Sequence, residues 1–271
     1  MDHTFDANSL NPDMIDKKRS NKLASSKMLS NIAQIRLVSN HPEVYEPCDD
    51  SFALVDALLA DRTNLLNMQP RFCMEVGSGS GYVIASLAIM LHQGCSGAQY
   101  FATDINPHAA ETTAATLEAH GVHAEIICTD LASGLGKRLA GMVDVIVVNP
   151  PYVPTPDDEV GCKGITSSWA GGENGRKVID RILPVVHSLL SEKGWLYMVT
   201  LTANNPSQIC SMMREMGYAS RIVVQRSTEE ESLHIIKFWR EHTEKGSGSS
   251  WLSQFPLLSF WRSSGAKESG I

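Results

Sequence analysis

Paired cysteines, long hydrophobic runs and an excess of basic residues are all missing from this sequence. Its six cysteines are scattered, with no CxxC pair and no cluster of histidines beside them. They are Cys48, Cys73, Cys95, Cys128, Cys162 and Cys210. This spacing argues against a zinc site and a disulfide framework, so we expect no bound metal, and free thiols in a reducing compartment.

Apolar runs of membrane-spanning length are missing too, because Asp, Gly or Pro interrupts each of the longest ones. A spanning helix needs about 20 consecutive apolar residues. The first residues, Met1-Asp2-His3-Thr4-Phe5, do not resemble the apolar core of a secretory signal. We therefore expect a cytoplasmic protein, which can also be nuclear, with no membrane partner.

Positive charge is scarce. The chain has 23 Lys and Arg residues against 30 Asp and Glu, which leaves a net charge of −7. An acidic surface repels a phosphate backbone, so we do not expect a nucleic-acid partner. Hydrophobic residues make up 43% of the 271 residues, which suffices for a globular core.

The two ends of the chain differ in composition from the middle. Residues 1–31 are polar and predict a flexible tail. Residues 243–271 contain a Gly/Ser stretch typical of a linker, followed by an apolar segment with Trp251 and Trp261. That segment could dock on the domain, bind a partner or have no role. We expect residues 32–242 to form one domain.

The middle alternates apolar, β-rich runs with helical periodicity. Strands are predicted over residues 72–76, 99–104, 124–128, 143–149, 195–201, 220–225 and 233–239. Helices are predicted over residues 51–66, 83–91, 107–120, 176–190 and 206–216. The first five strands are almost continuously apolar, as in a parallel sheet buried on both faces. The last two strands are separated by too few residues for a crossover helix, so they should form an antiparallel hairpin. The prediction is an α/β, doubly wound, seven-stranded, mostly parallel sheet with a C-terminal antiparallel hairpin.

A glycine-rich turn follows the first predicted strand, in Glu75-Val76-Gly77-Ser78-Gly79-Ser80-Gly81. Glycines let the backbone turn tightly and let a ligand approach it closely. The dinucleotide pattern GxGxxG fails because Tyr82 stands where its third glycine would be. The spacing ExGxGxG instead resembles the glycine loop of class I methyltransferases, which cradles S-adenosylmethionine, although a purely structural turn remains the alternative.

Carboxylates follow the second and third predicted strands. Asp104, with Ile105 beside it, can accept hydrogen bonds from two vicinal ribose hydroxyls. Asp130 could accept the adenine amino group while Leu131 packs on the ring. Each Asp taken alone could equally be a helix cap or a turn residue. Because three successive strands each end in such a feature, at the edge where open α/β sheets bind ligands, we favour an S-adenosylmethionine site.

The fourth predicted strand runs into Asn149-Pro150-Pro151-Tyr152. The prolines fix their own φ angles and hold the residues before them in extended geometry, which makes a rigid ledge. The Asn149 side-chain oxygen and the Pro150 carbonyl can hold both N–H groups of a planar amide or amine, and Tyr152 can stack on it. We predict Asn149, Pro150 and Tyr152 as catalytic residues. These three and Pro151 should bind substrate, and Asn149 should also contact the cofactor. A plain tight turn is the alternative.

Together these motifs resemble the HemK family of class I methyltransferases, in its short eukaryotic and archaeal branch. The resemblance rests also on residues 44–52 (VYEPCDDSF), 149–156 (NPPYVPTP) and 169–175 (WAGGENG), and it covers about residues 32–240. It implies a Rossmann-like fold with S-adenosylmethionine as cofactor. It further implies methylation of the glutamine in the Gly-Gly-Gln motif of a class I peptide chain release factor.

The resemblance also assigns residues to the site. The residues that it places beside the methionine end of the cofactor are Tyr45, Glu46, Pro47 and Ser51. Trp169 would shape the substrate loop, with a core side chain as the alternative. Asp49 or Asp50 can cap a helix whose N-terminus faces the site.

A partner follows from the resemblance as well. Bacterial relatives grip the release factor with an N-terminal helical bundle, whereas only a mostly polar tail precedes Tyr45 here. The short branch acts with a small zinc-containing activator subunit, docked along the strand predicted from Ala124 to Cys128. That strand would be an apolar edge of the sheet, which benefits from being covered.

Other functions are less well supported. An adenine-amino DNA methyltransferase uses the same ledge, but it needs a basic recognition region that this acidic chain lacks. A protein lysine methyltransferase stays possible because the acceptor site could admit an amine. An NAD-dependent oxidoreductase is disfavoured by the missing third glycine, the terminal hairpin and the Asn149-Pro150-Pro151-Tyr152 ledge.

Overall fold

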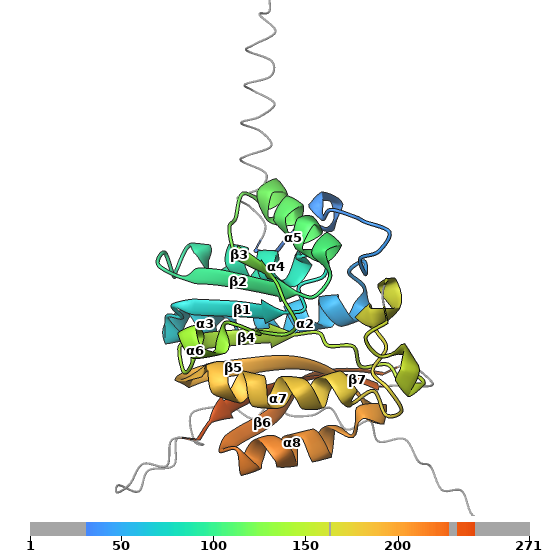
Figure 1. Cartoon of the computed structure of the whole chain (residues 1–271). Coiled ribbons are helices and arrows are strands. Elements are labelled where there is room, and N and C mark those ends of the chain that lie inside the picture. Colours follow the sequence, from blue (N-terminus) through green and yellow to red (C-terminus); the bar gives the residue numbers. More distant parts are fainter. Residues whose placement is uncertain (1–30, 163, 228–231, 242–271) are drawn as a thin grey trace, which may run out of the picture. The chain divides into compact units, whose positions relative to one another are not determined.

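Seven strands form one sheet in the computed structural model of the protein, which describes residues 31–162, 164–227 and 232–241 (Figure 1). The strand order is β3-β2-β1-β4-β5-β7-β6. The strands are β1 Phe72–Val76, β2 Gln99–Asp104, β3 Glu125–Cys128, β4 Val143–Val148, β5 Leu190–Leu201, β6 Tyr218–Ser227 and β7 Ser232–Arg240. β1 to β5 pair in parallel, whereas β7 pairs antiparallel with both β5 and β6. The predicted doubly wound sheet with its C-terminal hairpin is confirmed.

Helices cover both faces of this sheet (Figure 1). The α-helices are α2 Asp49–Ala60, α3 Arg62–Met68, α4 Tyr82–His92, α5 Pro107–His120, α6 Gly136–Leu139, α7 Lys177–Leu189 and α8 Pro206–Glu215. Short 3-10 helices are η1 Ile35–Leu37, η2 Asp157–Glu159, η3 Ile165–Ser168 and η4 Thr202–Asn204. One apolar core holds side chains of α2 and α4, and the other holds side chains of α7 and α8. Alternate residues of β4 enter the two cores, Val145 the first and Ile146 the second, as the strand period of two requires.

The strand order reverses between β1 and β4, and this reversal positions the site. From β1 the chain runs outward to β2 and β3, then returns to β4 on the other side of β1. Val76 at the end of β1 pairs with Val148 at the end of β4. The glycine loop and Asn149 therefore start from neighbouring strand ends, which is where open α/β sheets form a ligand crevice.

Several predicted boundaries were wrong, and three of them are set by contacts between distant segments. The helix predicted over residues 51–66 is two helices that break at Asp61, whose carboxylate accepts hydrogen bonds from Tyr197 and Lys237 of the sheet. β5 begins at Leu190 rather than at residue 195, because Leu190 already pairs with Val143. β3 begins at Glu125, so Ala124 precedes the edge strand rather than belonging to it. Long-range pairing, which local propensity does not contain, decides each of these boundaries.

The predicted tails lie outside the described residues, apart from Asn31. All described residues belong to the first of two compact units, Met1–Glu241. Within those residues no helix is long and apolar enough to cross a bilayer, and no group of His, Cys, Asp and Glu is arranged to hold a metal ion. The six cysteines are all free.

Candidate active site

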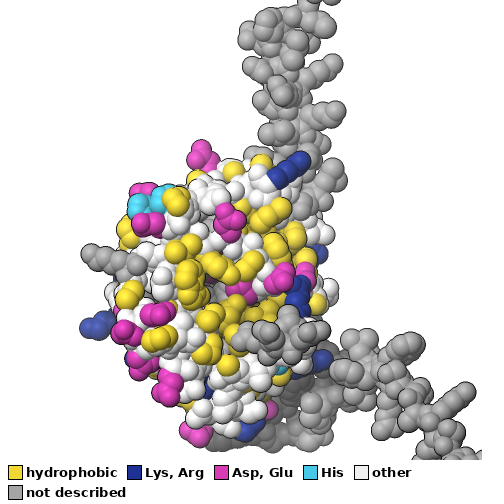
Figure 2. Space-filling model, turned by 90° about the vertical axis from the view of Figure 1, so that its right-hand side faces the viewer, with side chains coloured by type: hydrophobic (Ala, Val, Ile, Leu, Met, Phe, Trp, Pro, Cys, Tyr) yellow, Lys and Arg dark blue, Asp and Glu magenta, His cyan; other side chains and the backbone are white. Residues whose placement is uncertain are grey.

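A pocket opens at the carboxyl ends of β1, β2 and β4, and the loops that follow these strands line it. Figure 2 looks onto this end of the sheet and shows hydrophobic side chains gathered around the hollow, with Asp and Glu side chains between them. The carboxylates that line it belong to Asp50, Glu75, Asp104 and Asp130. The crevice predicted from the strand order is therefore present.

The glycine loop presents bare backbone to this pocket. Gly77 and Gly79 line it with φ angles of +79° and +51°, and a Cβ on either would meet no described atom within 4 Å. A ligand can therefore lie directly against this backbone. Gly81 has a different role, because its Cβ would come within 2.8 Å of Thr113 Cα. Gly81 lets α4 begin close to α5, and it lies outside the lining of the pocket.

Asp104 joins the glycine loop to the end of β2. Its Oδ2 accepts a hydrogen bond from the Gly79 amide at 2.8 Å, and its Oδ1 accepts one from the Asn106 amide at 2.9 Å. Burial raises the pKa of Asp104, while these amides act against the rise. A carboxylate has about four lone-pair sites, so both oxygens keep capacity for hydroxyl donors of a ligand. Ile105 beside it is 63% exposed and lines the same pocket.

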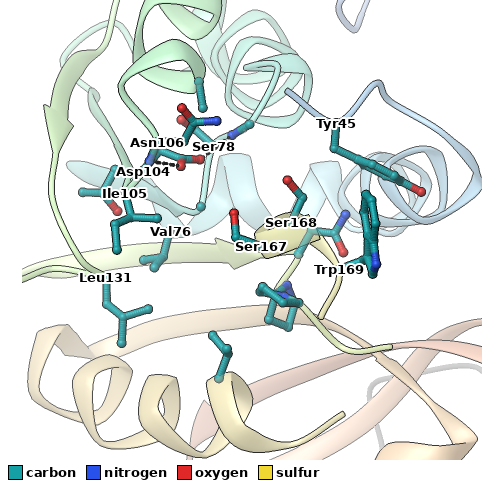
Figure 3. Close-up of a pocket in the computed structure, with 18 of the residues that line it drawn as sticks. Tyr45, Val76, Ser78, Asp104, Ile105, Asn106, Leu131, Ser167, Ser168 and Trp169 are labelled. Atoms are coloured by element: carbon teal, nitrogen blue, oxygen red, sulfur yellow. Dashed lines mark hydrogen bonds between the residues drawn. The ribbon is translucent and has the colours of Figure 1, made fainter. Parts of the chain in front are cut away.

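Asp130 and Leu131 also line the pocket, as predicted. Figure 3 shows Leu131 at the same end as Asp104 and Ile105. Asp130 is not free, because its Oδ2 accepts a hydrogen bond from Arg181 Nη2 of α7 at 2.5 Å. Arg181 itself lines the pocket. The sequence gave no sign of this pairing, because Arg181 on α7 is separated from Asp130 by 51 positions that include the whole of β4.

Glu75 supports the glycine loop from inside. Its side chain is 2% exposed, and its Oε2 accepts a hydrogen bond from the Ile84 amide in the first turn of α4 at 2.9 Å. Burial raises the pKa of Glu75 well above its ordinary value. The contact that the structure shows for Glu75 therefore holds the start of α4 in place, and direct cofactor binding stays a prediction.

The ledge after β4 lies at the centre of the pocket, since Asn149, Pro150, Pro151 and Tyr152 all line it. Asn149 Nδ2 donates a hydrogen bond to Asp50 Oδ2 at 3.1 Å, and the Tyr152 hydroxyl donates to the same oxygen at 2.8 Å. Asn149 Oδ1 is buried and has no hydrogen-bond partner within the described ranges. Leaving such an acceptor unpaired costs free energy, so this oxygen is ready for a donor from a ligand.

Asp50 is the functional residue that the sequence pattern misassigned. It does not cap α2, because Cys48 occupies the N-cap position and Asp50 is the second residue of the helix. Its partners Asn149 and Tyr152 lie 99 and 102 positions further along the chain. The one signal in the sequence was that Asp50 falls inside the motif at residues 44–52, which carries the family resemblance.

The motif at residues 44–52 divides between two places. Tyr45 and Ser51 line the pocket. Neither Glu46 nor Pro47 is among the described lining residues, so a contact of these two with the cofactor stays a prediction. Glu46 instead faces a neighbouring surface hollow, where its Oε1 accepts a hydrogen bond from Asn40 at 2.5 Å.

Trp169 lines the pocket at the end opposite Asp104 (Figure 3), together with the ring of Tyr45. Its backbone continues the ledge, because the Trp169 carbonyl accepts a hydrogen bond from the Val153 amide at 2.9 Å. Val153 also forms a parallel bridge with Ala170. The loop predicted to shape the substrate site is thus anchored directly to the ledge.

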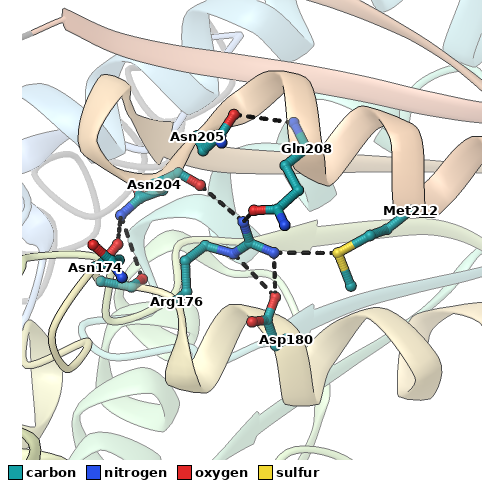
Figure 4. A network of polar contacts seen from close by, with 8 residues as sticks. Asn174, Arg176, Asp180, Asn204, Asn205, Gln208 and Met212 are labelled. Atoms are coloured by element: carbon teal, nitrogen blue, oxygen red, sulfur yellow. Dashed lines mark hydrogen bonds and ion pairs between the residues drawn. The ribbon is translucent and has the colours of Figure 1, made fainter.

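A buried asparagine that no local sequence pattern indicated holds this loop on the side away from the pocket. Asn204 Nδ2 donates to the carbonyls of Tyr152 at 2.7 Å and of Asn174 at 3.0 Å. Arg176 closes the network by donating to the Asn204 carbonyl at 3.1 Å (Figure 4). Gly175 passes so close that a Cβ there would lie 1.9 Å from the Tyr152 carbonyl oxygen. The substrate loop and the ledge are therefore one interlocked unit.

The residues assembled here fit S-adenosylmethionine and a nitrogen acceptor. Open glycine backbone and the Asp104 carboxylate suit a ribose and an amino-acid tail, and apolar Ile105 and Leu131 suit an adenine ring. The unpaired Asn149 oxygen suits an N–H donor at the other end. A doubly wound sheet with a terminal hairpin and this donor set defines a class I methyltransferase.

Comparison with known proteins specifies the family. The family model described as methyltransferase small domain matches residues 38–162. Methyltransferase HEMK2 of Homo sapiens is 46% identical, over 72% of this chain and 89% of that protein. The eRF1 methyltransferase catalytic subunit mtq2 of Schizosaccharomyces pombe is 32% identical, over 77% of this chain and 94% of that protein. The solved E. cuniculi Mtq2–Trm112 complex, responsible for methylation of the translation termination factor eRF1, matches with 28% identity and a TM-score of 0.55, covering 73% of this chain and 99% of the matched chain.

The chain belongs to the HemK family of class I methyltransferases. Its methyl donor is S-adenosylmethionine.

Proposed function

We propose that this protein methylates the side-chain amide nitrogen of the glutamine in the Gly-Gly-Gln motif of a class I peptide chain release factor. The observation that carries the proposal is the buried, unpaired Asn149 Oδ1 at the end of β4, beside Pro150. The fission yeast relative is named as a methyltransferase of eRF1, and the E. cuniculi complex methylates eRF1, which supports the same substrate class here.

The chemistry follows from the ledge. An amide nitrogen is a poor nucleophile because its lone pair is delocalised into the carbonyl. Holding one N–H on Asn149 Oδ1 and the other on the Pro150 carbonyl fixes the approach of the nitrogen and favours a tetrahedral geometry. S-adenosylmethionine, when bound, supplies the methyl group on an electron-poor sulfonium.

Tyr152 acts as a wall of the acceptor site rather than as a base. Burial, together with the negative charge of Asp50, raises the pKa of Tyr152, so its phenol keeps the proton that it donates to Asp50. The ring can then stack on the planar amide. No strong base is needed, because the nitrogen can release a proton after the methyl transfer.

We assign the cofactor to the rest of the pocket. Gly77 and Gly79 would lie against its methionine and ribose portions, and Asp104 would accept the ribose hydroxyls. Asp130, Ile105 and Leu131 would enclose the adenine, while Tyr45 and Ser51 would flank the methionine end. Glu75 and Gly81 would act indirectly, by shaping the glycine loop and the start of α4.

The direct test is transfer of labelled methyl groups. The enzyme is incubated with methyl-labelled S-adenosylmethionine and a release factor, and in parallel with the same factor carrying Gln→Ala in the Gly-Gly-Gln motif. We expect label in the first factor and none in the second. Equal label in both would contradict the proposal, and label only in a lysine peptide or in DNA would replace it with the corresponding alternative.

We further propose a small zinc-containing activator subunit that docks along β3. This strand lies at one edge of the sheet, where among the described strands it pairs only with β2, and its Ile126 and Ile127 are half-buried. An uncovered apolar edge favours association. Coexpression with such a subunit should raise soluble yield and activity, and Ile126→Lys should abolish that gain; unchanged yield and activity would remove the proposal.

A further inference from the structure

We propose that Asp50 is a positioning residue for methyl transfer, because its carboxylate sets which end of the Asn149 carboxamide faces the acceptor nitrogen. The proposal rests on the function proposed above for this site. It concerns a residue whose side chain holds the ledge without itself presenting a free atom to the substrate.

The carboxylate of Asp50 is occupied on both oxygens. Oδ2 accepts the hydrogen bonds from Asn149 and Tyr152. Oδ1 accepts from the Ser51 amide at 2.5 Å, the Ser51 hydroxyl at 3.1 Å and the Cys48 thiol at 3.2 Å. The residue is 5% exposed. Asp50 is therefore held firmly on α2 on one side and holds two ledge side chains on the other.

This arrangement makes the two orientations of the Asn149 carboxamide unequal. An ionised carboxylate only accepts hydrogen bonds, whereas a carboxamide donates at its nitrogen and accepts at its oxygen. With Nδ2 on Asp50, Oδ1 is left to accept an N–H of the substrate. If the Asn149 carboxamide were flipped, its Oδ1 would face Asp50 Oδ2, and two hydrogen-bond acceptors would repel each other. Its NH₂ group would then face the NH₂ group of the substrate amide, and two donors would meet. Asp50 thus selects the one orientation of Asn149 that can hold the methyl-accepting nitrogen of the substrate.

The surroundings of Asp50 differ from those of an Asp with a structural role. Asp144 is 3% exposed, and its carboxylate lies 3.8 Å from the ammonium of Lys193. In the described part of the chain no such ion pair involves Asp50, whose partners are neutral donors. The start of α2, a helix of 12 residues, offers partial positive charge in place of a cation. Two of the neutral donors are the ledge side chains that we assign to the reaction.

The first test compares Asp50→Asn with Asp49→Asn, which removes the same charge from the exposed neighbour on the same helix. Asn at position 50 keeps the size of the side chain but can donate as well as accept, so the Asn149 carboxamide is no longer held one way. We expect kcat for release-factor methylation to fall by about 10- to 100-fold in Asp50→Asn. The affinity for S-adenosylmethionine, measured by calorimetry, should not change. The melting temperature should fall, because the new NH₂ group would face one of the donors that Asp50 now accepts. Asp49→Asn should behave as wild type.

A second variant separates positioning from structural support. In an Asn149→Ala background Asp50→Asn should cause little further loss of kcat, because Asp50 acts through Asn149. Full additivity of the two changes, or a loss of cofactor affinity as large as the loss of kcat, would overturn the proposal.

A spectroscopic readout keeps this test apart from the choice of substrate. The side-chain ¹⁵N–H₂ signal of Asn149 is identified by its loss in Asn149→Ala. We expect it to shift in Asp50→Asn and to stay in place in Asp49→Asn, with no substrate present. If wild type fails to methylate the release factor while this signal shifts, the proposed substrate is wrong, whereas the orientation of Asn149 by Asp50 stands. If the signal does not move, the positioning role is wrong.

Discussion

At the scale of single residues, the side chains expected to bind the cofactor and those expected to bind the methyl-accepting nitrogen lie in different parts of the pocket. Asp104 holds the glycine loop at one end, through hydrogen bonds from the Gly79 and Asn106 amides. Asn149 stands on the ledge and offers an unpaired oxygen. Because the two side chains share no hydrogen bond, changes at each should have separable effects.

Asn149→Ala should keep cofactor binding and lower kcat by about 100-fold or more, since it removes one of the two acceptors that hold the nitrogen. Asp104→Ala should weaken cofactor binding first, since it removes the acceptor for the ribose. Calorimetry with S-adenosylmethionine and single-turnover methyl transfer measure the two effects. Equal loss of cofactor affinity in both variants would contradict this division of roles.

Glu75 gives a second prediction at this scale, on pH. Its raised pKa means that the folded protein binds a proton at Glu75 more tightly than the unfolded chain does. The stability due to this proton is complete below the unfolded pKa of about 4.3 and is lost as pH rises through the folded value. Glu75→Gln stays neutral and can still accept from the Ile84 amide, so its melting temperature relative to wild type should rise with pH. Parallel pH curves for the two proteins would show that Glu75 does not titrate on unfolding.

At the scale of elements, the ledge after β4 and the loop before α7 depend on each other. Asn204 donates to carbonyls of both segments, and Gly175 passes the Tyr152 carbonyl where no side chain fits. The network continues into α7 and α8 through Arg176, which donates to the Asn204 carbonyl and to Gln208 (Figure 4). The shape of the acceptor site is thus set by elements that do not touch the substrate.

Gly175→Ala tests this coupling, with Gly217→Ala as a matched control. Both glycines have positive φ, +65° and +89°, so both changes strain the backbone by about 1 to 2 kcal/mol. Only at position 175 would the new Cβ meet the Tyr152 carbonyl, whereas at position 217 it would meet no described atom within 4 Å. We expect both variants to melt earlier and only Gly175→Ala to lose methyl transfer per folded molecule. Similar kcat values for the two would refute the coupling.

At the scale of the whole molecule, a buried cluster ties the C-terminal hairpin to the helical layer. The Lys237 ammonium of β7 lies over the Trp195 ring, 3.2 Å from its centroid, and pairs with Asp61 at the break between α2 and α3. The Tyr197 hydroxyl donates to the same carboxylate at 2.5 Å. Both partners of the ion pair are mostly buried, with 12% and 16% of their side chains exposed.

Lys237→Met should therefore lower the free energy of unfolding by about 3 to 5 kcal/mol, because it leaves Asp61 without its cation. Adding Asp61→Asn should recover part of this loss, since the double variant has no unpaired charge. Urea unfolding of the two single variants and the double variant measures the coupling. If the losses of unfolding free energy in the two single variants add up to the loss in the double variant, the Lys237–Asp61 ion pair does not itself stabilise the fold.

The sequence by itself determined the sheet, its hairpin and most of the pocket. Apolar runs and helical periods are local patterns, so the strands and most helices could be read from them. Glycines after β1 and prolines after β4 act through backbone geometry close to themselves, and Asp104 at the end of β2 and Asp130 after β3 are placed by the strands that precede them. Since parallel strands bring their carboxyl ends to one edge, these local features had to meet.

Only the tertiary structure decided the contacts between distant segments. Packing placed the Asp50 carboxylate within hydrogen-bond distance of Asn149 and paired Asp130 with Arg181. It also placed the Asn204 side chain on the Tyr152 carbonyl, and it kept Glu46 out of the lining of the pocket. The break at Asp61 arose in the same way, from a partner 176 positions away. A residue's own sequence neighbours specify its backbone, but which side chains face one another depends on how whole helices and strands pack.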